Sequence, residues 1–471
     1  MTILLISPPY NYDELESASS RVPHLGLAMI GAMLEKEGFN VKILDMFALD
    51  MDVADIAREI RKIKPKIVGI TSVTSNFFQA MKVLKTVKLV DNTIITIFGG
   101  PHVTIMPETV IPSSYVDYVV IGEGEHVIIE LVNYILREKG KKSQIKGIGY
   151  ASNEKMVLTG IQPFIKNLDL LPMPAYHLLP MNSYRPYATL DVGRKFSSMI
   201  TSRGCPFRCT YCTSSSIFGH IWRARSPEKV LEEIELLYNK YNIRHIYFQD
   251  DEFTVNKNRV KEICNLILKS DMDIIWECLT RVDSVDDELI KLMAKAGCRS
   301  IIYGVETGYE EGLKKINKKI TLDQTKNAIR WTKKHGIIAR VTFIIGFPWE
   351  SEVEIKKTVN FAKKLDADIT YFNMLTPYPG TELYEIIKRD NLIVGKQDWK
   401  NYASHGREPV IRTRYLSNEE LHYWYGRAYL ECYLRPKFIL KKIIQMKNLH
   451  FFIKSTRAGF DLIKLSLKRF S

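Results

Sequence analysis

The fold of this 471-residue chain is limited above all by a regular alternation of short apolar runs with amphipathic helical patterns. In residues 1–140 the segments between the runs read as helices; within Gly26–Glu37, for example, Leu27, Ile30 and Leu34 share one face. Strands and helices alternating at this spacing predict an α/β, doubly wound, Rossmann-like sheet, which binds ligands at the carboxyl ends of its strands. The five predicted strands are Ile3–Ile6, Val41–Asp45, Ile67–Ser72, Ile94–Phe98 and Tyr118–Ile121.

A second series of the same kind begins near Ser197 and predicts a partial (β/α)6 TIM-type barrel, whose chemistry lies at the strand C-termini. Between the two series, residues 141–195 contain five prolines and predict a linker with little regular structure. The predicted domains are therefore 1–140, 141–195, 196–385 and a helical, aromatic and basic region at 386–471. The barrel strands are predicted at 197–202, 245–249, 273–279, 299–305, 339–345 and 369–374, and its helices at 227–240, 257–269, 286–296, 323–335 and 352–365.

Three cysteines follow the first predicted barrel strand in the segment Ser202-Arg203-Gly204-Cys205-Pro206-Phe207-Arg208-Cys209-Thr210-Tyr211-Cys212. Three thiolates at this C-x3-C-x2-C spacing can wrap one loop around a [4Fe–4S] cluster and leave one iron open, whereas a fourth cysteine would close the cluster. A zinc knuckle is the main alternative, but zinc normally takes four Cys or His ligands. His220, Cys264, Cys278 and Cys298 supply no well-spaced second pair. The spacing therefore predicts Cys205, Cys209 and Cys212 as ligands of an open iron–sulfur cluster.

This segment resembles the signature of the radical-SAM superfamily, C-x3-C-x-aromatic-C, with Tyr211 as the aromatic residue. The resemblance implies that S-adenosylmethionine (SAM) binds the open iron and is reductively cleaved to a 5′-deoxyadenosyl radical. It also implies SAM contacts at the ends of later barrel strands, although each of these residues could instead be a solvated polar group or part of a turn. These further positions are Asp250, Asp251, Glu306 and Gly346. No catalytic residue follows from the sequence.

The first turn of the N-terminal domain, Ser7-Pro8-Pro9-Tyr10-Asn11, disfavours NAD or FAD. Its prolines lack the N–H groups that would bind a pyrophosphate. Later loops instead resemble the cobalamin-binding domain fused to radical-SAM enzymes, a group that includes class B methyltransferases and anaerobic Mg-protoporphyrin ester cyclases. The resemblance covers roughly residues 1–385 and rests on domain order together with several loops. It implies cobalamin contacts at Ser72, Thr74, Gly99, Gly100, His102, Gly122 and Glu123.

The chain departs from many cobalamin domains at the motif D-x-H-x-x-G, whose histidine ligates cobalt from below. Counted back from Gly26, the motif places Arg21 at the Asp position and Pro23 at the His position, so His24 is one residue out of register. The departure predicts cobalamin bound without a protein imidazole, and His24 as a loop histidine. His102 remains open between a cobalamin contact and an ordinary polar loop residue.

The net charge of +14 is concentrated near the C-terminus, where residues 434–471 hold ten Lys or Arg against Asp461 alone. This distribution argues against a broad nucleic-acid surface. Basic amphipathic helices can lie on anionic membranes, but the favoured interpretation is that the apolar face packs on the barrel or on another subunit while the lysines stay solvated. The Tyr-rich stretch 415–433 is expected to cover the barrel mouth. With no signal peptide and no run long enough to span a bilayer, the protein is expected in the cytoplasm, with peripheral contact at the inner membrane face as an open alternative.

The leading hypothesis is an enzyme that uses the cluster, SAM and cobalamin to methylate an unactivated carbon of a small-molecule substrate, with lipids and tetrapyrroles as candidates. A low-potential electron donor such as ferredoxin or flavodoxin is the expected partner. The alternative is ring formation or oxidation with the same cofactors, as in the cyclase branch. A cobalamin sensor or an iron–sulfur electron carrier would be a third reading, but an electron carrier should close its cluster with a fourth cysteine.

Overall fold

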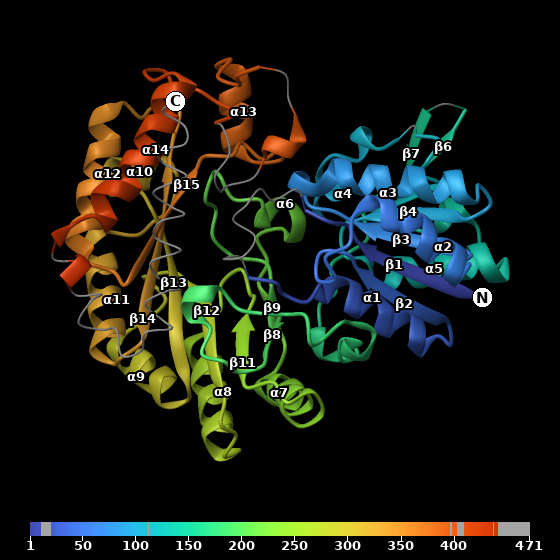
Figure 1. Ribbon diagram of the computed structural model, residues 1–471, viewed down its shortest axis with the longest axis horizontal. Coiled ribbons are helices and arrows are strands. Elements are labelled where there is room, and N and C mark those ends of the chain that lie inside the picture. The colour runs from blue at the N-terminus through green and yellow to red at the C-terminus, as the bar shows by residue number, and fades with distance from the viewer. Residues whose placement is uncertain are drawn as a thin grey trace. The chain divides into compact units, whose positions relative to one another are not determined.

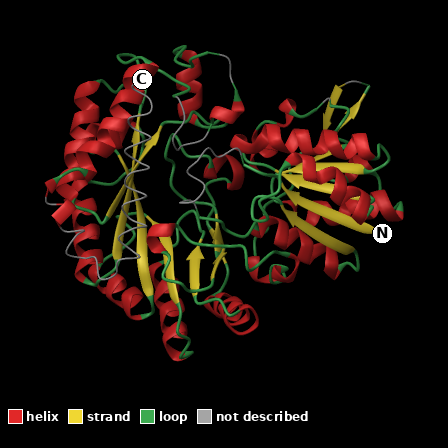
Figure 2. Cartoon of the chain, viewed as in Figure 1, coloured by secondary structure: helices red, strands yellow, loops and turns green. Residues whose placement is uncertain are grey.

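The computed structural model describes residues 1–10, 20–111, 113–153, 155–395, 398–402, 409–436 and 438–440. These residues form two compact units. The first takes in most of residues 1–185 together with Ser214–Arg225, and the second takes in Pro186–Thr213 and the described residues from Ser226 onward. Figure 1 labels the elements of both units, and Figure 2 shows that each unit combines strands with covering helices.

The first unit is built on a seven-stranded sheet in the order β2-β1-β3-β4-β5-β6-β7. Strands β1 to β5 pair in parallel, so the predicted doubly wound sheet is confirmed. The strands are β1 (Thr2–Ser7), β2 (Asn40–Asp45), β3 (Ile67–Thr71), β4 (Ile95–Gly99), β5 (Tyr118–Val120), β6 (Ile148–Ser152) and β7 (Lys155–Leu158). The helices are α1 (Leu25–Lys36), α2 (Ile56–Ile63), α3 (Phe77–Val90), α4 (Pro101–Ile105), α5 (Gly124–Arg137) and the short α6 (Ser214–Phe218).

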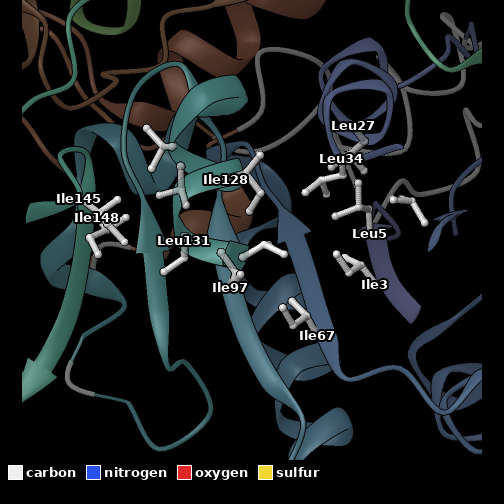
Figure 3. Close-up of a cluster of buried hydrophobic side chains, with 14 of the residues drawn as sticks. Ile3, Leu5, Leu27, Leu34, Ile67, Ile97, Ile128, Leu131, Ile145 and Ile148 are labelled. Carbon is white, nitrogen blue, oxygen red and sulfur yellow. The ribbon is translucent and has the colours of Figure 1, made fainter. Parts of the chain in front are cut away.

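Helices α1 and α5 contact each other and cover one core of this unit (Figure 3). Fully burying one aliphatic side chain of this size contributes roughly 1.5–3 kcal/mol, so this cluster fixes the sheet beneath the loops at its carboxyl edge. The buried residues include Ile3 and Leu5 of β1, Ile67 of β3, Ile97 of β4, Leu27 and Leu34 of α1, and Ile128 and Leu131 of α5.

The prediction of little regular structure in residues 141–195 was wrong for the first part of that segment. Strands β6 and β7 extend the sheet beyond β5 by antiparallel pairing. The physical reason is burial: Ile148 is fully buried and Tyr150 nearly so, and they join the same core as β5. The prolines that suggested a linker all lie after β7, where the described residues contain short 3-10 turns and an isolated bridge between Arg21 and Arg185 before the barrel.

The second unit carries six parallel strands in the order β15-β14-β13-β12-β11-β8. All six predicted strands and all five predicted helices are present, as a partial barrel requires. The strands are β8 (Phe196–Met199), β11 (His245–Phe248), β12 (Ile275–Thr280), β13 (Cys298–Glu306), β14 (Ile338–Ile345) and β15 (Ile369–Met374). The helices are α7 (Pro227–Tyr241), α8 (Lys257–Lys269), α9 (Asp287–Lys295), α11 (Leu322–Lys334) and α12 (Glu352–Leu365). Shorter elements are β9 (Ser202–Arg203), β10 (Arg223–Ala224, in the first unit), α10 (Glu310–Lys315) and α13 (Glu382–Arg389).

Each of the five barrel helices begins at a residue whose side chain accepts a hydrogen bond from a backbone N–H of the first turn. These N-cap residues are Ser226, Asn256, Asp286, Thr321 and Ser351. Such a cap satisfies an N–H that has no partner within the helix and contributes about 1 kcal/mol. Each cap sets the residue at which the loop between a barrel strand and the next helix ends, and so sets the length of that loop.

Helix α14 (Asn418–Tyr433) contains most of the Tyr-rich stretch, and the cover of the barrel mouth expected of that stretch stays a prediction. It packs against α12 and against the edge strand β15. The Tyr429 hydroxyl accepts from the Phe372 N–H (3.1 Å) and donates to the Phe372 carbonyl (2.9 Å). The Tyr433 hydroxyl binds the N–H (2.9 Å) and carbonyl (2.8 Å) of Thr370 in the same way. The two tyrosines thus satisfy an open sheet edge, which would otherwise invite pairing with another chain.

The basic segment beyond Leu440 lies outside the described residues, so its predicted membrane-binding or packing role stays a prediction. Within the described part of the chain, none of the helices combines the length and apolar character that a membrane crossing needs.

Candidate functional site

The cysteine loop of the second unit is fixed at its base by Asp250, which follows β11. One carboxylate oxygen of Asp250 accepts from the Thr201 N–H (2.7 Å), and the other accepts from the hydroxyls of Thr201 and Ser202 (both 2.6 Å). Arg259 donates to the Thr201 carbonyl (3.1 Å). Asp250 is 3% exposed, and this burial raises the pKa of its carboxyl. Sequence reasoning placed Asp250 against SAM, but its oxygens are already used to hold the chain just before Cys205.

Replacing Asp250 by Asn should weaken the hydrogen bonds that hold Thr201 and Ser202 just before the cysteine loop. The amide can still accept from the Thr201 N–H, but its NH₂ group cannot accept from two hydroxyls. We expect the D250N protein to lose roughly 1–3 kcal/mol of stability and to bind less iron per chain after anaerobic reconstitution. Thermal unfolding and iron analysis measure both, with D251N as the control because Asp251 is exposed. Equal iron content and melting temperature in D250N and D251N would contradict this assignment.

Cys205, Cys209 and Cys212 form no disulfide bond and are only partly buried. The loop is held on both sides: the Thr210 N–H donates to the Ile316 carbonyl (3.1 Å), and the Leu383 N–H donates to the Thr210 carbonyl (2.9 Å). Among the described residues, no three His, Cys, Asp or Glu side chains already stand in a metal-holding arrangement. The fit to an iron–sulfur cluster therefore rests on the donor set: three thiols on one anchored loop, with no fourth cysteine in its sequence.

A guanidinium lies beside this loop. Arg281, just after β12, places Nη1 3.9 Å from the Cys209 sulfur and its central carbon 3.6 Å from the centre of the Phe207 ring. Asp283 holds the same guanidinium through two hydrogen bonds of 2.9 Å. Arg281 therefore places a fixed positive charge beside one of the three predicted cluster ligands.

The predicted residues Tyr211 and Glu306 are brought together by Lys318, which sequence reasoning missed. Lys318 Nζ lies 2.9 Å from a Glu306 oxygen and 3.2 Å from the Tyr211 hydroxyl. Glu306 and Lys318 are each 6% exposed. Glu306 also ends β13 with φ of +71°, at a shift in strand register, a conformation that is uncommon for a residue other than glycine. Lys318 gave no signal because it lies in a run of lysines that reads as a solvated surface.

Gly346 follows β14 and begins a turn lined with aromatic rings. Its φ of +106° suits glycine, since other residues are strained there. Phe347 stacks on Trp349 with ring centres 5.3 Å apart, and Phe347 also meets Tyr211 edge to face at 6.3 Å. The structure thus connects two predicted SAM positions, Tyr211 and Gly346, through Phe347. Asp251, the remaining predicted SAM position, is exposed, and its contact with SAM stays a prediction.

In the first unit, the predicted cobalamin loops follow β3, β4 and β5 at one edge of the sheet. Ser72 is 2% exposed, and its hydroxyl has no hydrogen-bond partner among the described residues. Gly122 has φ of +79°, and a Cβ there would meet no atom within 4 Å. A buried hydroxyl without a partner and open space beside a glycine both fit a ligand that presses against these loops. At Gly100, by contrast, a Cβ would lie 2.5 Å from the Thr71 hydroxyl, so this glycine is needed for packing between loops.

Three other predicted cobalamin residues have partners within the protein. His102 is 1% exposed and lies between the hydroxyls of Thr74 (3.2 Å) and Thr109 (3.1 Å). Burial lowers the pKa of His102 to about 4, which keeps the imidazole neutral. Glu123 is bound by Arg223 Nη1 at 2.8 Å and also accepts from the Ile165 N–H (2.7 Å). Thr74, His102 and Glu123 therefore help to shape the loops, and Ser72 and Gly122 are better placed for contact with a ligand. The contact predicted at Gly99 stays a prediction.

His24 caps helix α1. Its Nδ1 accepts from the Leu27 N–H (3.3 Å), and burial lowers its pKa. Asp45, whose charge opposes that shift, accepts in turn from the Tyr184 hydroxyl (2.9 Å). One ring nitrogen of His24 thus has a structural use, in agreement with the interpretation of this residue as a loop histidine. The absence of a protein imidazole below cobalt stays a prediction.

Comparison with known proteins matches both units. Residues 199–362 match the radical SAM superfamily, and residues 15–132 match the B12 binding domain. An uncharacterized methyltransferase of Pyrococcus horikoshii is 39% identical over 451 residues, covering 94% of this chain and 95% of that protein. The anaerobic magnesium-protoporphyrin IX monomethyl ester cyclase of Rubrivivax gelatinosus is 30% identical over 394 residues, covering 82% of this chain and 70% of its own. The solved structure of the radical S-adenosylmethionine methyltransferase TsrM of Kitasatospora setae, with cobalamin and a [4Fe–4S] cluster bound, is similar in fold with a TM-score of 0.69. It is 21% identical and covers 89% of this chain and 80% of that chain.

The chain is an enzyme of the radical SAM superfamily. Within that superfamily it belongs to the group in which a B12-binding domain precedes the radical SAM barrel, and its cofactors are a [4Fe–4S] cluster, SAM and cobalamin.

Proposed function

We propose that this enzyme transfers a methyl group to an unactivated carbon of a small-molecule substrate. The observation that carries the proposal is a match of 39% identity along nearly the whole length of a protein named as a methyltransferase. Both sets of loops support it, because the cysteine loop and the loops after β3 to β5 each lie at the carboxyl edge of their own sheet, where ligands bind. When bound, the cofactors supply radical and methyl-transfer chemistry, and the protein holds and orients them.

The residues of the second unit have distinct tasks in this proposal. Cys205, Cys209 and Cys212 hold the cluster, and Asp250 fixes the chain from which they project. Glu306 and Lys318 are the buried charged pair beside Tyr211, so they are suited to the carboxylate and ammonium end of SAM. Burial in a medium of low dielectric strengthens such charge pairing and excludes water from a reactive site. In the first unit, Ser72, Gly99 and Gly122 are the residues proposed to contact cobalamin.

The substrate and partners are proposed at the level of chemical class. A low-potential donor such as ferredoxin or flavodoxin would deliver the electron that starts SAM cleavage. Lipids and tetrapyrroles remain candidate substrates. A peripheral membrane contact by the basic segment 441–471 is a separate prediction, and binding of the purified full chain to anionic vesicles would test it.

Ring formation with the same cofactors is the second candidate, and the 30% identity to the Rubrivivax gelatinosus cyclase is the observation that favours it. The two reactions differ in what becomes of SAM. Each methyl group transferred from SAM leaves one S-adenosylhomocysteine. Ring closure by hydrogen removal would instead use the 5′-deoxyadenosyl radical and leave 5′-deoxyadenosine without S-adenosylhomocysteine.

Cobalamin-loaded and cobalamin-free protein, both reconstituted with iron and sulfide, separate these candidates. We expect the loaded protein to form S-adenosylhomocysteine from SAM under reducing conditions, and the cobalamin-free protein to form none above background. Liquid chromatography with mass detection measures the product directly. No S-adenosylhomocysteine from the loaded protein while 5′-deoxyadenosine accumulates would reject the methyltransferase proposal in favour of cyclase-like chemistry. Equal amounts from both preparations would contradict the proposed dependence on cobalamin.

A further inference from the structure

The turn that begins at Gly346 is closed by a buried carboxylate four residues later. One oxygen of Glu350 accepts from the backbone N–H groups of Gly346 (2.8 Å) and Phe347 (3.1 Å). Glu350 is fully buried, as is Phe347. Two adjacent N–H groups aimed at one anionic oxygen form a compact anion-binding arrangement. Here the protein fills it with its own side chain, so the carboxylate fixes the shape of the turn.

The second oxygen of Glu350 extends the same network to the aromatic side chains. It accepts from the Tyr309 hydroxyl (3.3 Å), and the Tyr309 oxygen accepts from the Trp349 indole N–H (3.1 Å). Trp349 is the ring that stacks on Phe347, which in turn meets Tyr211 of the cysteine loop. A single carboxylate therefore positions both the backbone of the turn and the ring behind it.

We propose that Glu350 is the positioning residue that holds the Gly346–Phe347 turn in the shape that SAM binding requires. The inference rests on the proposed assignment of Gly346 to the SAM site. Glu350 acts through the turn, because its own oxygens are both engaged and its side chain is fully buried.

The charge on this carboxylate is sensitive to pH near neutrality. Burial raises the pKa of Glu350 to about 7, the hydrogen bonds from Gly346, Phe347 and Tyr309 oppose the shift, and the nearby Glu354 adds to it. The other groups facing it are the Thr413 hydroxyl, which donates to the Glu350 carbonyl, and Lys357, which lies over the Tyr309 ring. As pH falls through 7, the carboxylate is protonated and its bonds to the two N–H groups weaken. KM for SAM should then rise.

Falling pH is expected to weaken SAM binding through Glu350 but to increase the free energy of unfolding that Glu350 contributes. Because the folded-state pKa of Glu350 is raised, its contribution to stability is fully present below the unfolded pKa of about 4.5 and is lost as pH rises through 7. Replacing Glu350 by Gln removes a buried charge and keeps an acceptor, so the E350Q protein should be no less stable than wild type at pH 8. A change in SAM binding in E350Q at that pH would therefore not come from unfolding.

The experiment compares wild type with E350Q, E354Q and G346A. Glu354 is the matched control, since it bonds to the N–H and hydroxyl of Ser351 at the start of α12 and leaves the turn alone. We expect E350Q to raise KM for SAM about tenfold with kcat nearly unchanged, the loss expected when charge-assisted hydrogen bonds become neutral ones. In the chain without cofactors, amide hydrogen exchange of the peptide around 346–350 should quicken in E350Q but not in E354Q. KM of E350Q should no longer depend on pH between 6 and 8.

Two results would overturn the inference in different ways. If G346A raises KM for SAM while E350Q changes neither KM nor hydrogen exchange, the turn belongs to the SAM site but Glu350 does not position it. If even the strained G346A leaves KM for SAM unchanged, the assignment of this turn to SAM is wrong and the inference fails with it.

Discussion

Replacing Cys209 by Ala is expected to remove the iron–sulfur cluster and to reduce 5′-deoxyadenosine formation to the level without enzyme. The physical reason is the count of ligands: with three thiolates one iron is already open to SAM, and losing another leaves two irons without protein ligands. Cys205→Ala and Cys212→Ala should behave in the same way. Anaerobic reconstitution followed by iron analysis, visible absorption and product chromatography measures the effect.

Cys432→Ala is the matched control for this prediction. Cys432 lies on α14, is 3% exposed, and belongs to the buried apolar surface of that helix. Its replacement should leave cluster content and 5′-deoxyadenosine formation close to wild type. If Cys209→Ala retained wild-type iron and product, the cluster would have to be held elsewhere and the assignment of the loop would be wrong.

Replacing Lys318 by Met should have the second-largest effect. The change leaves Glu306 buried without its cation, and breaking a buried pair in this way costs on the order of 3–5 kcal/mol. It also removes the cation that we propose for the SAM carboxylate. We therefore expect both a lower melting temperature and a loss of SAM cleavage of at least about 100-fold, since a hydrogen-bonded charge pair is worth several kcal/mol in a buried site.

Two further variants separate stability from function at this pair. Lys319→Met changes the exposed neighbour of Lys318 and should affect neither property. The double variant Glu306→Gln with Lys318→Met removes both charges, so it should recover much of the stability but none of the SAM cleavage. Recovery of activity in the double variant would show that the pair serves the fold alone.

The fold was largely predictable because its periodic patterns agree with its burial. The barrel strands are short apolar runs that are buried along most of their length, as expected of a parallel sheet. Each barrel helix begins at a capping residue that the sequence displays. The hairpin of β6 and β7 escaped prediction because it contains few strongly patterned residues and stands next to a proline-rich stretch. Its place in the sheet depends on the β5 edge that it covers, which is a tertiary property.

Site residues could be predicted where the chemistry requires a fixed spacing along the chain. Residues whose partners come from distant segments could not be predicted, because only the fold brings them together. The cysteine motif is local, so three ligands could be named from spacing alone. Asp250 has the right position after a strand. Only the structure shows that its carboxylate oxygens already accept hydrogen bonds from the hydroxyls of Thr201 and Ser202. Lys318 and Glu350 have no local signal for their tasks, because their partners lie 12 residues away along the chain or in the backbone of a turn.

The amount of 5′-deoxyadenosine formed by the wild-type protein tests the central claim most directly. The protein would be purified anaerobically, reconstituted with iron and sulfide, and given SAM with and without a low-potential reductant. Reductant-dependent 5′-deoxyadenosine, at more than one equivalent per cluster, is the predicted result for an enzyme that cleaves SAM at the cysteine loop. No product above the reductant-free control, in protein whose cluster content is intact, would contradict it.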